Sequence, residues 1–103
     1  MAKVGLYVKF LAQSGQRDAL VKVLLGAADL MAGAPGCELY VVNTASGEED
    51  VVWVTEIWRS AADHEGSLSV AGVKELIGQA MPLLAGPPER IDVQPAGGVG
   101  LRG

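Results

Sequence analysis

The spacing of apolar residues switches between two periods along this chain, and the order of those periods restricts the possible folds. A period of two indicates a strand, whereas apolar residues at every third or fourth position indicate an amphipathic helix. Turn residues such as Ser14-Gly15 and Pro35-Gly36 separate the segments. The expected elements, in order, are a strand at 3–11, a helix at 16–33, strands at 37–44 and 51–59, a helix at 73–84 and a strand at 90–95.

This β-α-β-β-α-β order predicts a ferredoxin-like α+β fold, in which two helices cover one face of a four-stranded antiparallel sheet. The chain has 103 residues, enough for a single domain over residues 1–103 and too few for a second core. The glycine-rich end, from about residue 97 to 103, is expected to be a flexible tail.

The predicted strands are apolar on both faces, which is not typical of a sheet with one face in water. In the third strand, for example, Trp53 and Ile57 point to one side and Val54 and Trp58 to the other. The face that the helices leave open therefore needs an apolar cover. We expect a homodimer joined through that open face, because a second copy of the same sheet is the simplest cover.

Charge and hydropathy exclude several classes of partner. Eight lysine and arginine residues against twelve aspartate and glutamate residues give a net charge of −4, and the basic residues are scattered. We therefore expect no nucleic-acid partner and no binding to a membrane. The N-terminal residues do not resemble a signal peptide, no apolar run approaches the roughly 18 residues of a membrane span, and Cys37 is the only cysteine. These features favour a cytoplasmic protein without disulfides.

No motif in the sequence indicates a cofactor. One histidine and one cysteine cannot supply the usual nitrogen and sulfur ligands of a zinc or iron site. Neither of the glycine-rich nucleotide-binding motifs, G-x-G-x-x-G and G-x-x-x-x-G-K-[ST], is present. We therefore expect no metal, flavin or haem.

The segment from Glu56 to His64 is the strongest candidate for a functional site. Glu56 and Trp58 share one face of the predicted strand. Ser60, with Asp63 three residues later, matches the Ser-x-x-Asp capping box that begins a helix, and the histidine lies in the first turn of that helix. A carboxylate, an indole and an imidazole are therefore expected to converge at one strand-to-helix junction.

Structural roles can account for the same residues. Glu56 could form an ion pair that only stabilises the fold, and His64 could be exposed to solvent. Aromatic residues on strands, such as Phe10 and Trp53, often only pack in a core. The functional alternative is an apolar cavity between sheet and helices, with tyrosine hydroxyls and an indole N–H as its polar points.

The chain resembles the antibiotic biosynthesis monooxygenase family over about its first 85 residues. The matching features are Pro35-Gly36-Cys37 before the second strand, Tyr40 within it, the run Glu56-x-Trp58-x-Ser60, and His64 on the following helix. The resemblance implies a dimeric α+β barrel, made by two sheets packed face to face, with one cavity in each subunit. It also implies oxidation of electron-rich aromatics, such as hydroquinones and anthrones, in many cases without a cofactor.

The family pattern is incomplete in this chain. Haem-degrading relatives have an asparagine on the first strand and a histidine about ten residues after the tryptophan, where this chain has residues near Val8 and Leu68. We therefore do not expect haem degradation. Some aromatic monooxygenases have an asparagine four residues before the tryptophan, and this chain has Val54 there. Asn43 could replace it if its strand lies alongside.

We therefore expect a cofactor-independent monooxygenase that oxidises a small electron-rich aromatic with O₂. The expected catalytic residues are His64, Glu56 and Trp58, with either His64 or Glu56 as the base. Tyr7, Tyr40 and Asn43 are expected to line the substrate site. Two alternatives remain open: a non-catalytic small-molecule-binding dimer, and an isomerase or decarboxylase on the same barrel.

Overall fold

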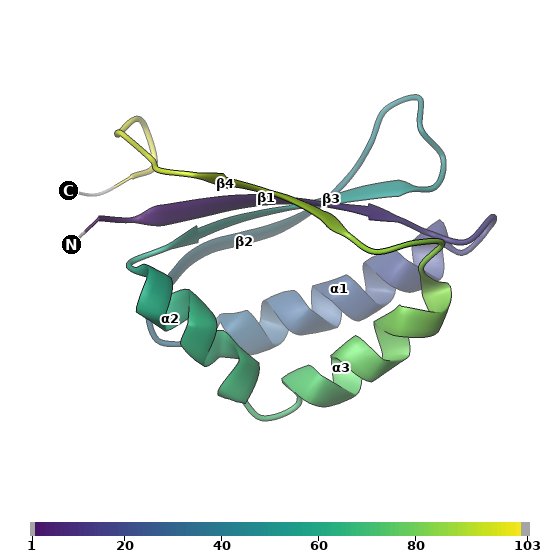
Figure 1. Ribbon diagram of the computed structural model, residues 1–103, viewed down its shortest axis with the longest axis horizontal. Helices are drawn as coiled ribbons and strands as arrows, with labels where there is room; N and C mark the ends of the chain where they lie inside the picture. The colour runs from purple at the N-terminus through teal and green to yellow at the C-terminus, as the bar shows by residue number, and fades with distance from the viewer. Residues whose placement is uncertain (1, 102–103) are drawn as a thin grey trace.

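The computed structural model describes residues 2–101 and confirms the predicted fold class and order of elements (Figure 1). Three short segments lie between these elements: the helix that the capping box predicts after the third strand, and a 3₁₀ turn before and after the last helix. The last two residues of the expected tail, 102–103, lie outside the described residues. The elements are β1 (Val4–Leu11), α1 (Arg17–Met31), β2 (Cys37–Thr44), β3 (Val51–Trp58), α2 (Ala61–Gly66), η1 (Ser67–Ser69), α3 (Val73–Ala80), η2 (Met81–Leu83) and β4 (Glu89–Val93).

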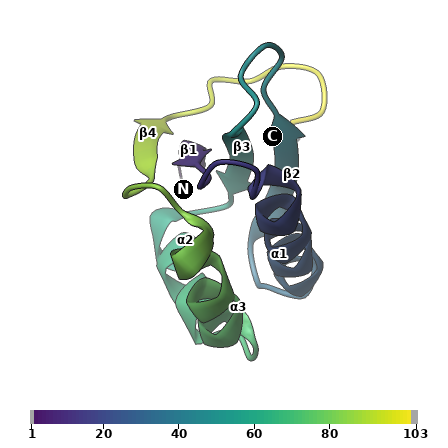
Figure 2. The same cartoon turned by 90° about the vertical axis from the view of Figure 1, so that its right-hand side faces the viewer.

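The sheet has the strand order β2-β3-β1-β4, and each neighbouring pair is antiparallel. All the helices lie on one face of this sheet (Figure 1). The end-on view in Figure 2 shows α1 beneath the β2 side and α2 and α3 beneath the β4 side. β3 is an interior strand, so its helix-facing side chains are enclosed by the neighbouring strands β2 and β1 and by the helices that cover this face.

The last predicted helix is shorter than the apolar stripe that indicated it. α3 ends at Ala80, and the chain continues through the 3₁₀ turn η2, which contains Pro82 in its first turn. Proline has no backbone N–H and disfavours an α-helical conformation in the residue before it. The α-helix therefore gives way to a 3₁₀ turn at this point. Ala80, Leu83 and Leu84 still pack against the core.

The core lies between the sheet and the helices. Its most buried large side chains come from the helix-facing side of β3 and from α1: Trp58, Val52 and Val54 on the strand, and Leu20 on the helix. The alternation on β3 is the one that the sequence predicts, since residues 52, 54, 56 and 58 are all buried. Among residues 2–101 no helix is long and apolar enough to cross a membrane.

The opposite face of the sheet carries apolar side chains that nothing covers within the chain. Tyr7, Val41 and Ile91 on this face are 43%, 41% and 53% exposed. They lie in one row across the sheet, because Tyr7 pairs with both Thr55 and Ile91, and Thr55, which lies between Tyr7 and Val41, pairs with Val41. An exposed apolar surface that continues across four strands is typical of an interface.

This surface predicts a homodimer in solution. We expect sedimentation equilibrium to give a dimer at micromolar concentration, with an interface of well over about 1,000 Å². Val41→Asp should shift the protein toward monomer, because it places a charge within the apolar contact. Leu25→Asp is the matched control, since Leu25 is also an exposed apolar residue, at 50% against 41% for Val41, but lies on α1. A monomeric wild-type protein would contradict the prediction.

Candidate functional site

The junction between β3 and α2 is built by a cap and a glycine. Ser60 has an extended backbone, and its hydroxyl accepts a hydrogen bond from the Asp63 N–H at 3.2 Å, which confirms that the helix begins there. The Asp63 carboxylate accepts a hydrogen bond from Arg59 Nε at 2.7 Å. Gly36 packs against this carboxylate with a φ of +80°, a conformation that favours glycine. The junction fixes the start of α2 and therefore the position of His64.

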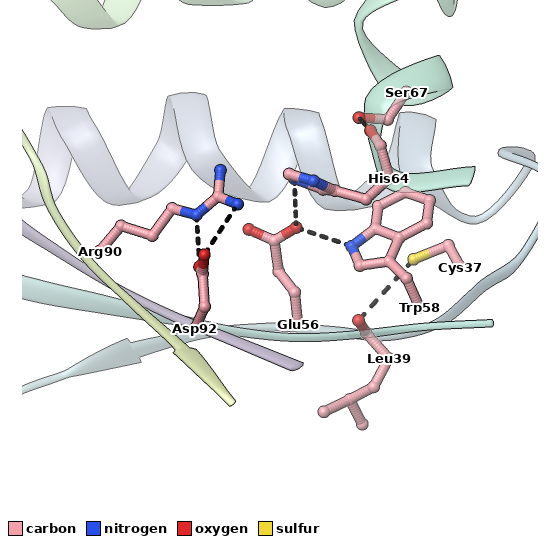
Figure 3. Close-up of polar contacts among 8 residues, drawn as sticks. All are labelled: Cys37, Leu39, Glu56, Trp58, His64, Ser67, Arg90 and Asp92. Atoms are coloured by element: carbon pink, nitrogen blue, oxygen red, sulfur yellow. Dashed lines mark hydrogen bonds and ion pairs between the residues drawn. The ribbon is translucent and has the colours of Figure 1, made fainter. Parts of the chain in front are cut away.

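The three predicted catalytic residues meet at this junction (Figure 3). The Trp58 indole N–H donates a hydrogen bond to Glu56 Oε1 at 2.9 Å. His64 Nε2 lies 3.9 Å from the same carboxylate oxygen, close enough for an ion pair when the imidazole is protonated. The rings of Trp58 and His64 meet edge to face with centroids 5.5 Å apart. Figure 3 shows the second oxygen of Glu56 directed away from Trp58, toward the side of Arg90.

Burial sets the protonation behaviour of Glu56. The residue is only 8% exposed, and burial raises the pKa of its carboxyl above the ordinary range. The Trp58 hydrogen bond and the charges of His64 and Arg90 act in the opposite direction and reduce this shift. Glu56 is therefore a carboxylate that holds a proton more readily than an exposed one, as a general base working near neutral pH requires.

A cavity of about 290 Å³ lies between the sheet and the helices, with Glu56 and His64 in its wall. Its remaining polar lining consists of Tyr40 and Ser67, and the rest is apolar, with Phe10 from β1 and side chains of α1 and α3. An apolar pocket with a few convergent polar groups is the usual form of a small-molecule site. Of the six residues expected at the site, Glu56, His64 and Tyr40 line this cavity.

Trp58 has a different position from the one expected. The indole has no exposed surface and does not line the cavity, so it cannot be a wall against which a ligand stacks. It lies behind Glu56 and His64, where its N–H orients the carboxylate. Trp58 is therefore a positioning residue in this geometry.

Tyr40 belongs to the cavity, whereas Tyr7 and Asn43 do not. Tyr40 is paired in register with Glu56 and lies on the same face of the sheet. Tyr7 is paired with Thr55, and Asn43 with Trp53, so both lie on the open face. The Asn43 amide donates a hydrogen bond to the Trp53 carbonyl at 3.1 Å and to Thr55 Oγ1 at 3.2 Å, across the two strands. The sheet separates these two residues from the candidate site.

A second hollow of about 460 Å³ adjoins the cavity, with His64 and Leu68 as the shared wall. It contains Arg90 and Asp92, which form an ion pair at 2.6 Å. The sequence analysis did not identify these two residues. They face the same side as Glu56 because Asp92 pairs with Leu6, which pairs in turn with Glu56. The alternation of side chains along residues 89–93 could have predicted that Arg90 and Asp92 share one face of their strand. It could not have predicted that this face lies on the same side of the sheet as Glu56.

The structure gives no indication of a metal site in the part that it describes. Among residues 2–101 no group of three or more histidine, cysteine, aspartate or glutamate side chains is placed to hold a metal ion. Cys37 lies at the start of β2, and burial raises the pKa of its thiol, with a further contribution from the Glu56 charge. This thiol is therefore a weak nucleophile and a weak metal ligand.

Comparison with known proteins supports the fold and shows the family. The model of the antibiotic biosynthesis monooxygenase family matches residues 4–78. A protein from Chloroflexus aurantiacus, provisionally named an antibiotic biosynthesis monooxygenase, is 38% identical, with 94% of this chain and 96% of that chain covered and a TM-score of 0.86. No curated protein matches the sequence.

More distant solved structures share the fold alone. A protein from Caulobacter crescentus with the same provisional name is 23% identical, with 93% of this chain and 92% of that chain covered and a TM-score of 0.86. The protein Rv0793 from Mycobacterium tuberculosis is 17% identical, with coverages of 95% and 99% and a TM-score of 0.84. The shared architecture persists although most side chains differ.

Burial of Glu56 predicts a specific dependence of stability on pH. Its pKa is raised in the folded protein, so the associated stability is fully present below the unfolded pKa and is lost as pH rises through the folded pKa. Glu56→Gln removes this loss and keeps an oxygen that can accept from Trp58. Relative to wild type, the variant should therefore gain unfolding free energy as pH rises from about 4 to about 8.

Urea denaturation at each pH, at one protein concentration, measures this difference. Glu75→Gln is the control, because Glu75 is an exposed carboxylate on α3. Its curve should stay parallel to that of wild type. A parallel curve for Glu56→Gln would contradict the prediction.

The contact between Gly36 and Asp63 predicts a second effect on stability. Gly36→Ala forces a non-glycine residue into a positive φ and places its Cβ against the Asp63 carboxylate. Gly47→Ala is a matched control, because Gly47 has the same φ of +80° but no neighbour within 4 Å of the added Cβ. We expect about 1 kcal/mol of destabilisation for Gly47→Ala and about 1–2 kcal/mol more for Gly36→Ala, measured by urea denaturation. Equal losses would show that the contact does not stabilise the junction.

Proposed function

The chain belongs to the antibiotic biosynthesis monooxygenase family, and we propose that it oxidises a small electron-rich aromatic substrate with O₂ without a cofactor. One observation carries this proposal: the buried carboxylate of Glu56 has one oxygen held by Trp58 and the other directed away from that partner, in the wall of an apolar cavity. A general base needs this combination of fixed orientation, raised pKa and access to substrate.

The proposed reaction begins with a proton transfer. Glu56 removes a proton from a hydroquinone or anthrone, and the electron pair of the broken bond remains on the substrate as an electron-rich anion. This anion gives one electron to O₂, and the resulting radical pair combines to form a C–O bond. For a CH₂ group, loss of the remaining C–H proton and cleavage of the O–O bond then leave a carbonyl group and release water. The atoms of O₂ divide between product and water.

The site contains groups that can assist this sequence. Tyr40 and His64 lie in the same cavity wall as Glu56, where they can stabilise negative charge on a substrate oxygen. His64 also faces the adjoining hollow. It can therefore accept the proton from Glu56 and pass it outward, which restores the base for the next turnover.

Oxygen uptake with a panel of hydroquinones and anthrones tests the proposal. The assay should contain a chelator and no added cofactor. Protein-dependent uptake with formation of the quinone or carbonyl product is expected. Binding without turnover would instead support a small-molecule-binding dimer, and anaerobic turnover would support an isomerase or decarboxylase.

Substitutions at the two candidate bases separate their roles. Glu56→Gln should lower kcat by about 10²-fold or more, because the base is lost while the hydrogen bond from Trp58 is kept. His64→Ala should lower kcat less, because a residue that only relays the proton can be replaced by water. The control is Glu75→Gln, which should retain wild-type activity. A larger loss for His64→Ala than for Glu56→Gln would assign the base to His64.

The proposed assembly is a homodimer through the open face of the sheet. The cavity lies between the sheet and the helices, on the side away from this interface, so each subunit would have its own site. The dimer would cover the apolar side of the strand that holds Glu56, and would leave the helix-covered side free for substrate.

A further inference from the structure

Tyr40 and Glu56 form a pair across two neighbouring strands. They are partners in the register of β2 and β3, and both line the cavity of about 290 Å³. Side chains that are directly opposite in an antiparallel pair have their Cβ atoms about 4.5–5.5 Å apart. The two side chains therefore project from adjacent positions on the same face of the sheet, and a phenolic hydroxyl and a carboxylate both belong to the cavity wall.

Both groups have hydrogen-bonding capacity that the protein does not use. Glu56 Oε1 accepts the Trp58 N–H, but within residues 2–101 neither Glu56 Oε2 nor the Tyr40 hydroxyl forms a hydrogen bond. In that part of the chain, no fully buried polar side-chain atom lacks a partner, so these two atoms are not fully buried. Because both residues line the cavity, we take a ligand in the cavity to be their partner.

We propose that Tyr40 and Glu56 together hold one hydroxyl oxygen of a neutral phenol or enol. The Tyr40 hydroxyl donates a hydrogen bond to that oxygen, and Glu56 Oε2 accepts its proton. The inference deepens the proposed function, since it takes this cavity as the substrate site. It makes Tyr40 a catalytic residue, because its hydroxyl contacts the reacting oxygen.

The electrostatics of the cavity agree with this division of roles. Burial, the Glu56 charge and the nearby Cys37 raise the pKa of Tyr40, so the tyrosine stays protonated and remains a donor. The Trp58 hydrogen bond and the electrostatic effects of His64 and Arg90 lower the pKa of Glu56 and so favour its ionised form against the effect of burial. A ligand with its own carboxylate would be repelled by Glu56, whereas a neutral hydroxyl would not.

The proton transfer balances within the pair. The O–H bond of the ligand breaks, its proton forms an O–H bond with Glu56 Oε2, and its electron pair stays on the ligand oxygen. The Tyr40 hydrogen bond stabilises the negative charge that develops there. No oxidant or metal is needed for this step, so it can be measured without oxygen consumption.

4-Nitrophenol is a suitable probe, because its anion absorbs visible light and the neutral form does not. We expect wild-type protein to bind it, and Tyr40→Phe to bind it about tenfold more weakly, since the hydrogen bond from Tyr40 to the phenol oxygen is lost. Tyr7→Phe is the matched control, because Tyr7 lies on the open face of the sheet. It should change the Kd by less than about twofold. No binding to wild type, or equal binding to both variants, would overturn the inference.

Two further measurements do not depend on the Kd of a single variant. The first is the pKa of the bound phenol, read from its absorbance. It should be higher in Tyr40→Phe than in wild type, because the donor that favours the anion is gone. An unchanged pKa would contradict the pairing.

The second compares two ligands of the wild-type protein. 4-Nitroanisole should bind at least about tenfold more weakly than 4-nitrophenol, because its methyl ether has no proton to give Glu56. Equal binding of the two compounds would overturn the role of Glu56 Oε2.

These outcomes are separable from the outcome of the oxygen assay. Phenol binding that depends on Tyr40, without oxygen uptake by any substrate, would support this inference and contradict the proposed monooxygenase. Oxygen uptake that Tyr40→Phe leaves unchanged would do the reverse.

Discussion

The hydrogen bond from the Trp58 indole to Glu56 is the interaction on which the candidate site depends. An ionised carboxylate beside an apolar cavity is unstable unless a donor compensates for the lost water. The 2.9 Å bond supplies that donor and engages only one of the two carboxylate oxygens. It therefore keeps Glu56 in the cavity wall and leaves its other oxygen for a ligand. Because Trp58 is fully buried, water does not compete with Glu56 for its N–H.

The period of the strand explains why the donor and the acceptor come from the same segment. Glu56 and Trp58 are two residues apart on β3, so they project from the same face and need no distant contact to meet. His64 joins them because the Ser60 cap turns the chain back over that face within a few residues. The carboxylate, the indole and the imidazole of the candidate site thus come from nine consecutive residues, 56–64, that span one strand-to-helix junction.

Local patterns therefore predicted the fold class, the strand faces and the convergence of Glu56, Trp58 and His64. They could not predict which side of the sheet Tyr7 and Asn43 occupy relative to Glu56, because that depends on the register between strands. Arg90 was missed for the same reason, since β4 is far from β3 in sequence and is linked to it only through β1. The role of Trp58 depended on packing. A tryptophan beside an acid is consistent with a ligand platform, and only its complete burial shows that it supports Glu56 instead.

The two faces of the sheet connect the proposed assembly with the proposed chemistry. Glu56 is flanked along β3 by Thr55 and Ile57, whose side chains point to the open face. A second copy that covers this face would restrict the same backbone that carries the base. Interior packing transmits small displacements because it is close to the density of an organic crystal. The pairing of Glu56 with Tyr40 is already present within one chain, and dimer formation would then restrict the movement of the two strands that carry them. A surface that no ligand touches would thus help to hold the geometry needed for a shared ligand oxygen.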